Sequence, residues 1–193
     1  MFHVKQSLEK YQKLLHKWQK TINLVSNSTL QDSWNRHFED SLQVLPYIPQ
    51  GINNLVDIGS GAGFPGLVVA MARPDIKVSL IESDGKKCSF MKSVSRETLC
   101  PVTVICERIE NTDLDIVPDM ISARALASLD KLFGLCEKWI IENPKIQLLF
   151  LKGQTFQDEI DQCQKSWNFD YDIHPSKTDD NGVVMLISNI SKK

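Results

Sequence analysis

A chain of 193 residues, 42% of them hydrophobic and 24% charged, has the composition of one globular domain with a sizeable buried core. A formal net charge of −2 excludes a protein that coats nucleic acid through bulk charge, so contact with nucleic acid has to come from a local basic surface. No apolar run approaches the roughly 20 residues of a membrane span, and the five cysteines form no C-x-x-C pair, so we expect no membrane segment, no metal site and a cytoplasmic location.

Residues 1–50 predict a helical cap. Apolar residues from Val4 to Ile22 recur at steps of three and four, which is the spacing of one helix face. A turn near Asn23–Ser28 and a second helix from Leu30 to Leu45 follow, and Pro46 ends the second helix. No strand pattern appears before residue 54, so we expect these helices to cover a catalytic core at residues 51–193, with the whole chain, 1–193, as one domain.

The core alternates short apolar strands with helices. Strands are expected at Asn54–Ile58, Lys77–Ile81, Val102–Cys106, Met120–Ala123 and Ile146–Leu151, and helices at Gly66–Ala72, Lys86–Leu99, Leu129–Ile141 and Phe156–Lys165. Two final strands, near Phe169–Ile173 and Val183–Ser188, flank an Asn-Gly turn of the hairpin type. This pattern predicts an α/β, Rossmann-like fold with a mostly parallel seven-stranded sheet and an antiparallel edge strand.

A glycine-rich turn, DIGSGAGFPG from Asp57 to Gly66, joins the first strand to the first helix of the core. Ligands of open α/β sheets bind at the carboxyl ends of the strands, and glycines there let the backbone approach a ligand closely. Glu82 ends the second strand, about 20 residues beyond the turn, where an acidic side chain reaches ribose hydroxyls. The predicted site of a nucleotide-like cofactor therefore includes Asp57, Gly59, Gly61, Gly63 and Glu82.

Two cofactors fit this layout. A dinucleotide fingerprint, G-x-G-x-x-G, would place its third glycine where this chain has Phe64, and it needs a helix N-terminus that accepts pyrophosphate. S-adenosylmethionine carries a sulfonium cation and an α-amino group instead of a phosphate, so the acid Asp57 suits it better. The residues favour S-adenosylmethionine, while a dinucleotide, or a turn that serves chain reversal alone, stays open as an alternative.

Two more segments are expected at the same sheet edge. Ile109 and Glu110 follow the third strand, where residues of this fold class flank an adenine, although a solvated charged loop is the commoner interpretation. Arg124 ends the fourth strand, where it either contacts a ligand or pairs with Glu82 or Asp57.

Several segments of the chain carry a family resemblance. They are, in order, RH and DSL (from Arg36 and Asp40), DIGSGAGFPG, ARPDIKVSLIESDGKKCSFM, ERIE, ISARALASL and FLKGQ. In these segments the chain resembles the RsmG (GidB) family, which methylates guanine N7 in small-subunit ribosomal RNA. The resemblance runs from about Asn23 to about Gln154. It implies a class I methyltransferase fold and a ribosomal RNA or assembling small ribosomal subunit as partner, and we expect a monomer. It implies S-adenosylmethionine contacts at Gly59, Phe64, Ile109, Glu110 and Arg124.

The segment after the fourth strand bears on the acceptor atom. Cytosine C5 methylation needs a cysteine nucleophile, but Cys100 precedes a strand, and the N-P-P-Y or D-P-P-Y loop typical of exocyclic amine methylation is replaced by SARALAS. Guanine N7 loses no proton on methylation, so no general base is required, and no catalytic residue is identified. An NAD-dependent oxidoreductase and a non-catalytic S-adenosylmethionine-binding scaffold remain as alternative functions.

Basic residues could supply the local surface for RNA. Lys10 and Lys17 of the first helix, and Lys86 and Lys87 after the second strand, are candidates, although lysines beside an apolar stripe are more often a solvated face. A lone histidine is more often structural, so His37 is not assigned to the site.

Overall fold

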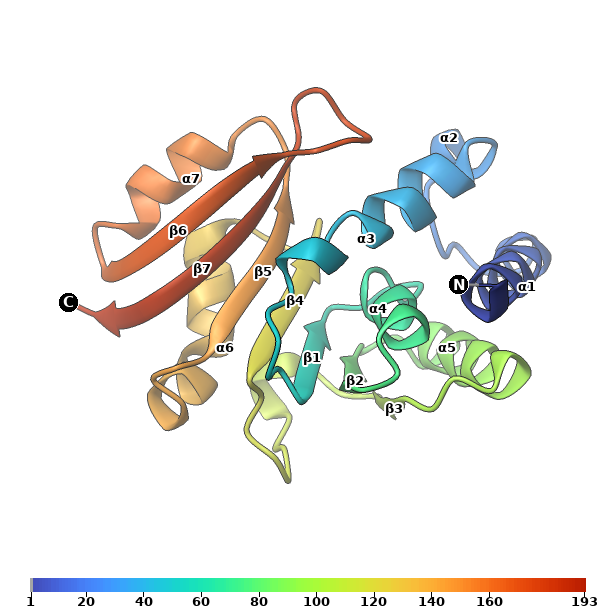
Figure 1. Cartoon of the computed structure of the whole chain (residues 1–193), viewed down its shortest axis with the longest axis horizontal. Coiled ribbons are helices and arrows are strands. Elements are labelled where there is room, and N and C mark those ends of the chain that lie inside the picture. The colour runs from blue at the N-terminus through green and yellow to red at the C-terminus, as the bar shows by residue number, and fades with distance from the viewer. Residues whose placement is uncertain (1) are drawn as a thin grey trace.

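A computed structural model describes residues 2–193 as one seven-stranded sheet with helices on both faces (Figure 1). The strand order is β3-β2-β1-β4-β5-β7-β6. The strands are β1 Asn54–Ile58, β2 Lys77–Ile81, β3 Thr103–Ile105, β4 Met120–Arg124, β5 Gln147–Lys152, β6 Trp167–Pro175 and β7 Val183–Lys192. Every predicted strand is present, and β7 alone runs well beyond its predicted end, Ser188.

The direction of the strands follows the prediction of a mostly parallel sheet. β1 pairs in parallel with both β2 and β4, β2 with β3, and β4 with β5. The closing hairpin lies at one edge, and its strand β7 runs antiparallel to both β5 and β6. The strand order turns back between β1 and β4, so their carboxyl ends open a crevice of the kind that holds ligands in open α/β sheets.

Two separate cores cover the faces of the sheet. One contains the cap together with α4 Gly66–Ala72 and α5 Gly85–Thr98, and the other contains α6 Leu129–Glu142 and α7 Phe156–Cys163. Asp84 begins α5 by accepting the backbone N–H of Lys86 at 2.8 Å and of Lys87 at 3.2 Å. Leu99, with φ of 55°, ends the same helix in the left-handed conformation.

The first helix of the cap, α1 Phe2–Gln19, packs against α4 and α5 (Figure 1). It ends at Gln19, before the predicted Ile22. The Gln19 side chain binds the backbone of the turn that follows the helix. Gln19 Oε1 accepts the N–H groups of Leu24 at 2.9 Å and Val25 at 3.1 Å. This turn directs Leu24 and Val25 toward the carboxyl edge of the sheet.

The predicted helical stretch from Leu30 to Leu45 is helical over most of its length, but it is not one regular α-helix. The segment consists of α2 Asn27–Leu30, a π-helical turn at Trp34–Glu39, α3 Asp40–Leu42 and a 3₁₀ turn at Leu45–Tyr47. His37 and Phe38, consecutive residues of the π turn, are both buried. Such turns often occur at functional sites.

No helix among residues 2–193 is long and apolar enough to cross a membrane. Within the same residues, no group of three His, Cys, Asp or Glu side chains is arranged to hold a metal ion.

Candidate active site

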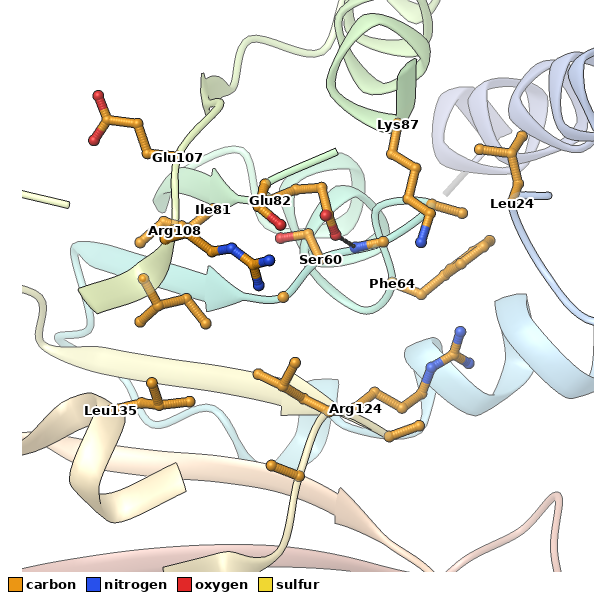
Figure 2. A pocket seen from close by; sticks show the side chains of 18 of the residues that line it. Leu24, Ser60, Phe64, Ile81, Glu82, Lys87, Glu107, Arg108, Arg124 and Leu135 are labelled. Atoms are coloured by element: carbon orange, nitrogen blue, oxygen red, sulfur yellow. Dashed lines mark hydrogen bonds between the residues drawn. The ribbon is translucent and has the colours of Figure 1, made fainter. Parts of the chain in front are cut away.

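A cavity of about 480 Å³ opens at the carboxyl ends of β1, β2, β3 and β4 (Figure 2). This volume is in the range of small-molecule and cofactor sites. Its walls come from the loop that follows each of these strands and from Leu24, Val25 and His37 of the cap. Seven of the nine residues predicted for the cofactor site line it: Gly59, Gly61, Phe64, Glu82, Ile109, Glu110 and Arg124.

The glycine-rich turn folds back on itself under the cavity. Ser60 N–H donates to Ile81 O at 3.0 Å, and Gly63 N–H donates to Ser60 O at 2.7 Å. Gly61 has φ of 57°, and a Cβ built on it meets only Gly59 O, at 3.9 Å. Because Gly61 lines the cavity, the space beside its Cα is open for a ligand rather than filled by protein.

Asp57 and Gly63 do not line the cavity. Asp57 is fully buried beneath the turn, where its Oδ1 accepts Ser122 Oγ at 2.6 Å, while its Oδ2 has no hydrogen-bond partner among residues 2–193. Burial raises the pKa of Asp57 to about 6, and the hydrogen bond from Ser122 limits the rise. A Cβ on Gly63 would come within 2.9 Å of Tyr11 Oη, so this glycine faces the cap. Both residues therefore support the turn on the side that faces away from the cavity.

Glu82 lines the cavity and also ties two loops together. Its Oε2 accepts the backbone N–H of Gly61 at 2.9 Å (Figure 2). Its Oε1 accepts the backbone N–H of Asp84 at 2.9 Å. The carboxylate therefore holds the turn after β1 against the loop after β2, in addition to the ribose contact that the sequence predicts for it.

Ile109 and Glu110 begin a short 3₁₀ turn after β3. Ile109 is buried, and Lys138 of α6 donates to its carbonyl at 3.3 Å and to the carbonyl of Thr112. This partly buried lysine contact fixes the loop against α6, so the solvated-loop interpretation does not describe Ile109, whereas Glu110 is exposed.

Arg124 pairs with the cap and not with Glu82 or Asp57, so that part of the sequence prediction was wrong. Its Nη1 lies 2.9 Å from Asp40 Oδ2 and donates to Arg36 O at 3.2 Å. Its Nη2 lies 3.2 Å from His37 Nδ1. The guanidinium carbon stands 5.0 Å from the Phe64 ring centroid, a cation–π distance.

Three aromatic rings stack across the boundary between cap and turn. The Phe64 ring stacks on the Tyr11 ring, with the centroids 5.0 Å apart and an interplanar angle of 13°. It also stacks on the His37 ring, with the centroids 5.3 Å apart and an interplanar angle of 24°. Tyr11 also donates its hydroxyl to Ala62 O in the turn. Burial and then the charge of Arg124 lower the pKa of His37 to about 4, so its imidazole is neutral at pH 7. The cap therefore builds one wall of the site.

The loop after β4 is held from behind by a buried ion pair. Lys152 Nζ lies 2.5 Å from Glu159 Oε2 and donates to Ala127 O at 2.7 Å, and Glu159 accepts the N–H of Leu129 at 2.8 Å. Leu126, in the same loop, lies over Gly59. Lys152 is absent from the predicted site, although it lies in FLKGQ, one of the segments that carry the family resemblance.

The basic residues are distributed unevenly around the cavity. Lys87, Arg108 and Lys131 line it, so part of the predicted α5 cluster lies at the site. Lys10 instead points to α5, where its Nζ lies 3.5 Å from Glu97 Oε2. Lys17 is exposed on α1.

Comparison with known proteins gives a family. The family model GidB, described as rRNA small subunit methyltransferase G, matches residues 4–180. A ribosomal RNA small subunit methyltransferase G from Parvibaculum lavamentivorans is 45% identical over 184 residues, covering 93% of this chain and 80% of that protein. A protein of the same name from Paramagnetospirillum magneticum is 46% identical over 186 residues, covering 96% of this chain and 88% of that protein.

Solved structures give the same fold. A magnesium protoporphyrin IX methyltransferase from Synechocystis, crystallised with bound SAM, aligns with a TM-score of 0.63 at 11% identity. The alignment covers 92% of this chain and 95% of that chain. At this identity the likeness establishes the class I methyltransferase fold alone.

Proposed function

The chain belongs to the GidB family, rRNA small subunit methyltransferase G, and on this premise we propose that it transfers a methyl group from S-adenosylmethionine to N7 of a guanosine in 16S ribosomal RNA. The observation that carries the proposal is the glycine-rich turn, which opens on a cavity of cofactor size where the strand order reverses.

The residues present fit S-adenosylmethionine. Open space beside Gly61 accommodates a ligand against the backbone, and the Glu82 carboxylate faces the same cavity, where a ribose would bind. Ile109 and Glu110 would flank the adenine from the loop after β3. At the start of α4, Pro65 has no N–H and the N–H of Leu67 already donates to Gly63 O at 2.8 Å, so this helix N-terminus offers few donors to a pyrophosphate. The cofactor, when bound, supplies an activated methyl group on a sulfonium.

The reaction needs alignment more than proton transfer. A bond forms between guanine N7 and the methyl carbon while the sulfur–carbon bond breaks, and the electron pair of the broken bond stays on sulfur. No proton leaves N7, so the task of the protein is to hold nucleophile, carbon and sulfur in line. A neutral His37 suits such a site because it adds no positive charge beside the one that passes from the sulfonium to the purine.

Cap and core would work together on a large substrate. Tyr11, His37 and Asp40 all reach the site from the cap, which supports one catalytic unit spanning residues 1–193. We propose that this unit is a monomeric cytoplasmic enzyme, and that its partner is ribosomal RNA or the assembling small ribosomal subunit. Lys87, Arg108 and Lys131 at the cavity are suitable contacts for RNA phosphates.

Mass spectrometry of 16S ribosomal RNA from cells with and without the gene tests the proposal. We expect 7-methylguanosine at one position to disappear on deletion and to return with the intact gene. Unchanged methylation would refute the proposed acceptor. Thermal unfolding with S-adenosylhomocysteine or NADH separates the alternatives, because a ligand at 100 times its dissociation constant adds about 2.7 kcal/mol of stability.

A further inference from the structure

A second cavity, of about 310 Å³, adjoins the cofactor cavity. The two share His37, Arg124 and Ala125 as lining residues. The far side of the second cavity is formed by Lys152 and Gly153 at the end of β5 and by the turn between β6 and β7. A ligand in the second cavity can therefore contact Arg124, which also lines the cofactor cavity.

The guanidinium of Arg124 is held in one orientation at this junction. Asp40 and Arg36 O take hydrogens of Nη1, and His37 takes one of Nη2. Within residues 2–193, the second Nη2 hydrogen and the Nε hydrogen make no hydrogen bond, which leaves donors for a ligand. Asp40 itself is fully engaged, since its Oδ1 accepts Gln43 at 2.8 Å and Thr178 at 2.7 Å.

We propose that the second cavity receives the target guanine, unstacked from its RNA, and that Arg124 donates a hydrogen bond to O6 of this base. The inference rests on the proposed function, since N7 has to face the cofactor cavity. O6 and N7 are neighbours on the same edge of guanine, so a donor at the junction of the two cavities meets O6 when N7 faces the methyl group.

This contact selects guanine over adenine. Adenine presents a 6-amino donor where guanine presents the O6 acceptor, and a guanidinium has no acceptor to offer it. Because Asp40 and the Phe64 ring hold the guanidinium, it cannot turn away at low cost. A base inside a duplex does not reach a cavity walled by the cap, β5 and the closing hairpin, so the nucleotide has to leave its stack.

Two base analogues test the contact in the wild-type protein. Semi-synthetic 16S RNA would carry guanine, inosine or 2,6-diaminopurine at the methylated position. Inosine keeps N7 and O6 but lacks the 2-amino group, whereas 2,6-diaminopurine keeps N7 and the 2-amino group but replaces O6 by an amine. We expect kcat/KM for inosine to exceed that for 2,6-diaminopurine by roughly 10- to 100-fold. Equal rates on the two analogues, or a faster rate on 2,6-diaminopurine, would overturn the proposal.

A pair of variants assigns the contact to Arg124. In Arg124→Gln, the amide can donate to O6 or accept from a 6-amino group, so the preference for inosine should fall to within about threefold. Arg108→Gln is the matched control, because Arg108 lines the cofactor cavity and not the second cavity. The preference of this variant for inosine over 2,6-diaminopurine should stay at the wild-type value. A tenfold preference retained by Arg124→Gln would show that another group reads O6. Failure of the wild-type protein to methylate guanine RNA would instead refute the proposed function.

Discussion

Arg124 at the end of β4 and Asp40 in the cap form an ion pair of 2.9 Å between side chains that are each 16% exposed. The pair connects the loop that follows the fourth strand to a cap more than 80 residues earlier in the chain. Through Thr178, Asp40 also contacts the turn of the closing hairpin. One carboxylate therefore joins three of the parts of the chain that surround the second cavity: the cap, the end of β4 and the turn of the closing hairpin.

Asp40→Asn should lower the free energy of unfolding by about 2–3 kcal/mol, because it leaves the guanidinium of Arg124 mostly buried without its counter-charge. Urea denaturation measures the change. Asp179→Asn is the matched control, since Asp179 lies 3.5 Å from Arg36 in a pair whose side chains are 42% and 40% exposed. That variant should lose less than about 0.5 kcal/mol. Equal losses in the two variants would show that the Arg124 pair contributes no more than a surface pair.

Gly61→Val should abolish binding of S-adenosylhomocysteine while the protein stays folded. The added side chain takes the open space beside the cavity and is strained at φ of 57°. Isothermal titration on a variant with a native circular dichroism spectrum is the measurement. Gly134→Val on α6, where a Cβ meets nothing within 4 Å, should bind as the wild type does. Wild-type affinity in Gly61→Val would place the cofactor elsewhere.

Glu82→Ala should weaken S-adenosylmethionine by roughly 1–3 kcal/mol, since it leaves ribose hydroxyls and the N–H of Gly61 without a partner. Glu82→Gln separates the two roles, because an amide oxygen can still accept from one backbone N–H while the negative charge is lost. We expect Glu82→Gln to retain the thermal stability of the wild type more closely than its affinity. Loss of stability without loss of affinity in both variants would limit Glu82 to a structural role.

The pH dependence of stability should separate Asp57 from His37. The pKa of Asp57 is raised from 3.8 to about 6, so its ionisation destabilises the fold as the pH rises through this window. The pKa of His37 is lowered from 6.5 to about 4, so stability from His37 is complete above pH 6.5 and is lost as the pH falls toward 4. The two effects oppose each other between about pH 4 and pH 6.

As the pH rises from 4 to 6.5, the free energy of unfolding of Asp57→Asn should therefore increase by about 2–3 kcal/mol relative to that of the wild type. His37→Gln should lose a similar amount relative to the wild type over the same range, because it removes the stability that His37 recovers on losing its proton. Urea denaturation at four pH values measures both differences. A difference between variant and wild type that does not change with pH would contradict the shifted pKa of the residue concerned.

The parts of the structure that depend on local sequence were predictable. The strands from Asn54 to Ile58 and from Lys77 to Ile81 are short segments rich in Leu, Val and Ile, and the glycines between them favour a turn by their own conformational freedom. Gly61 and Glu82 could be placed at one sheet edge because parallel strands align their carboxyl ends.

The parts that depend on docking of the cap were not predictable. In the π turn, His37 packs against Phe64 of the core, and the partner of Arg124 depends on where α3 lies on the core. Nothing in the spacing of Asp40 and Arg124 along the chain indicates their contact. The burial of Asp57 beneath the turn likewise depends on β4, which supplies Ser122.

Single-turnover transfer of a labelled methyl group to RNA that carries 7-deazaguanine at the target position tests the central claim most directly. This analogue retains O6 and the Watson–Crick edge but has carbon in place of the nucleophilic nitrogen. Because the N7 lone pair makes the proposed attack on the methyl carbon, we predict that this RNA binds normally but accepts no methyl group. The same RNA with guanine at the target position should be fully methylated. A labelled methyl group on the 7-deazaguanine RNA would contradict the account, since the acceptor would then be another atom and the site would need a base.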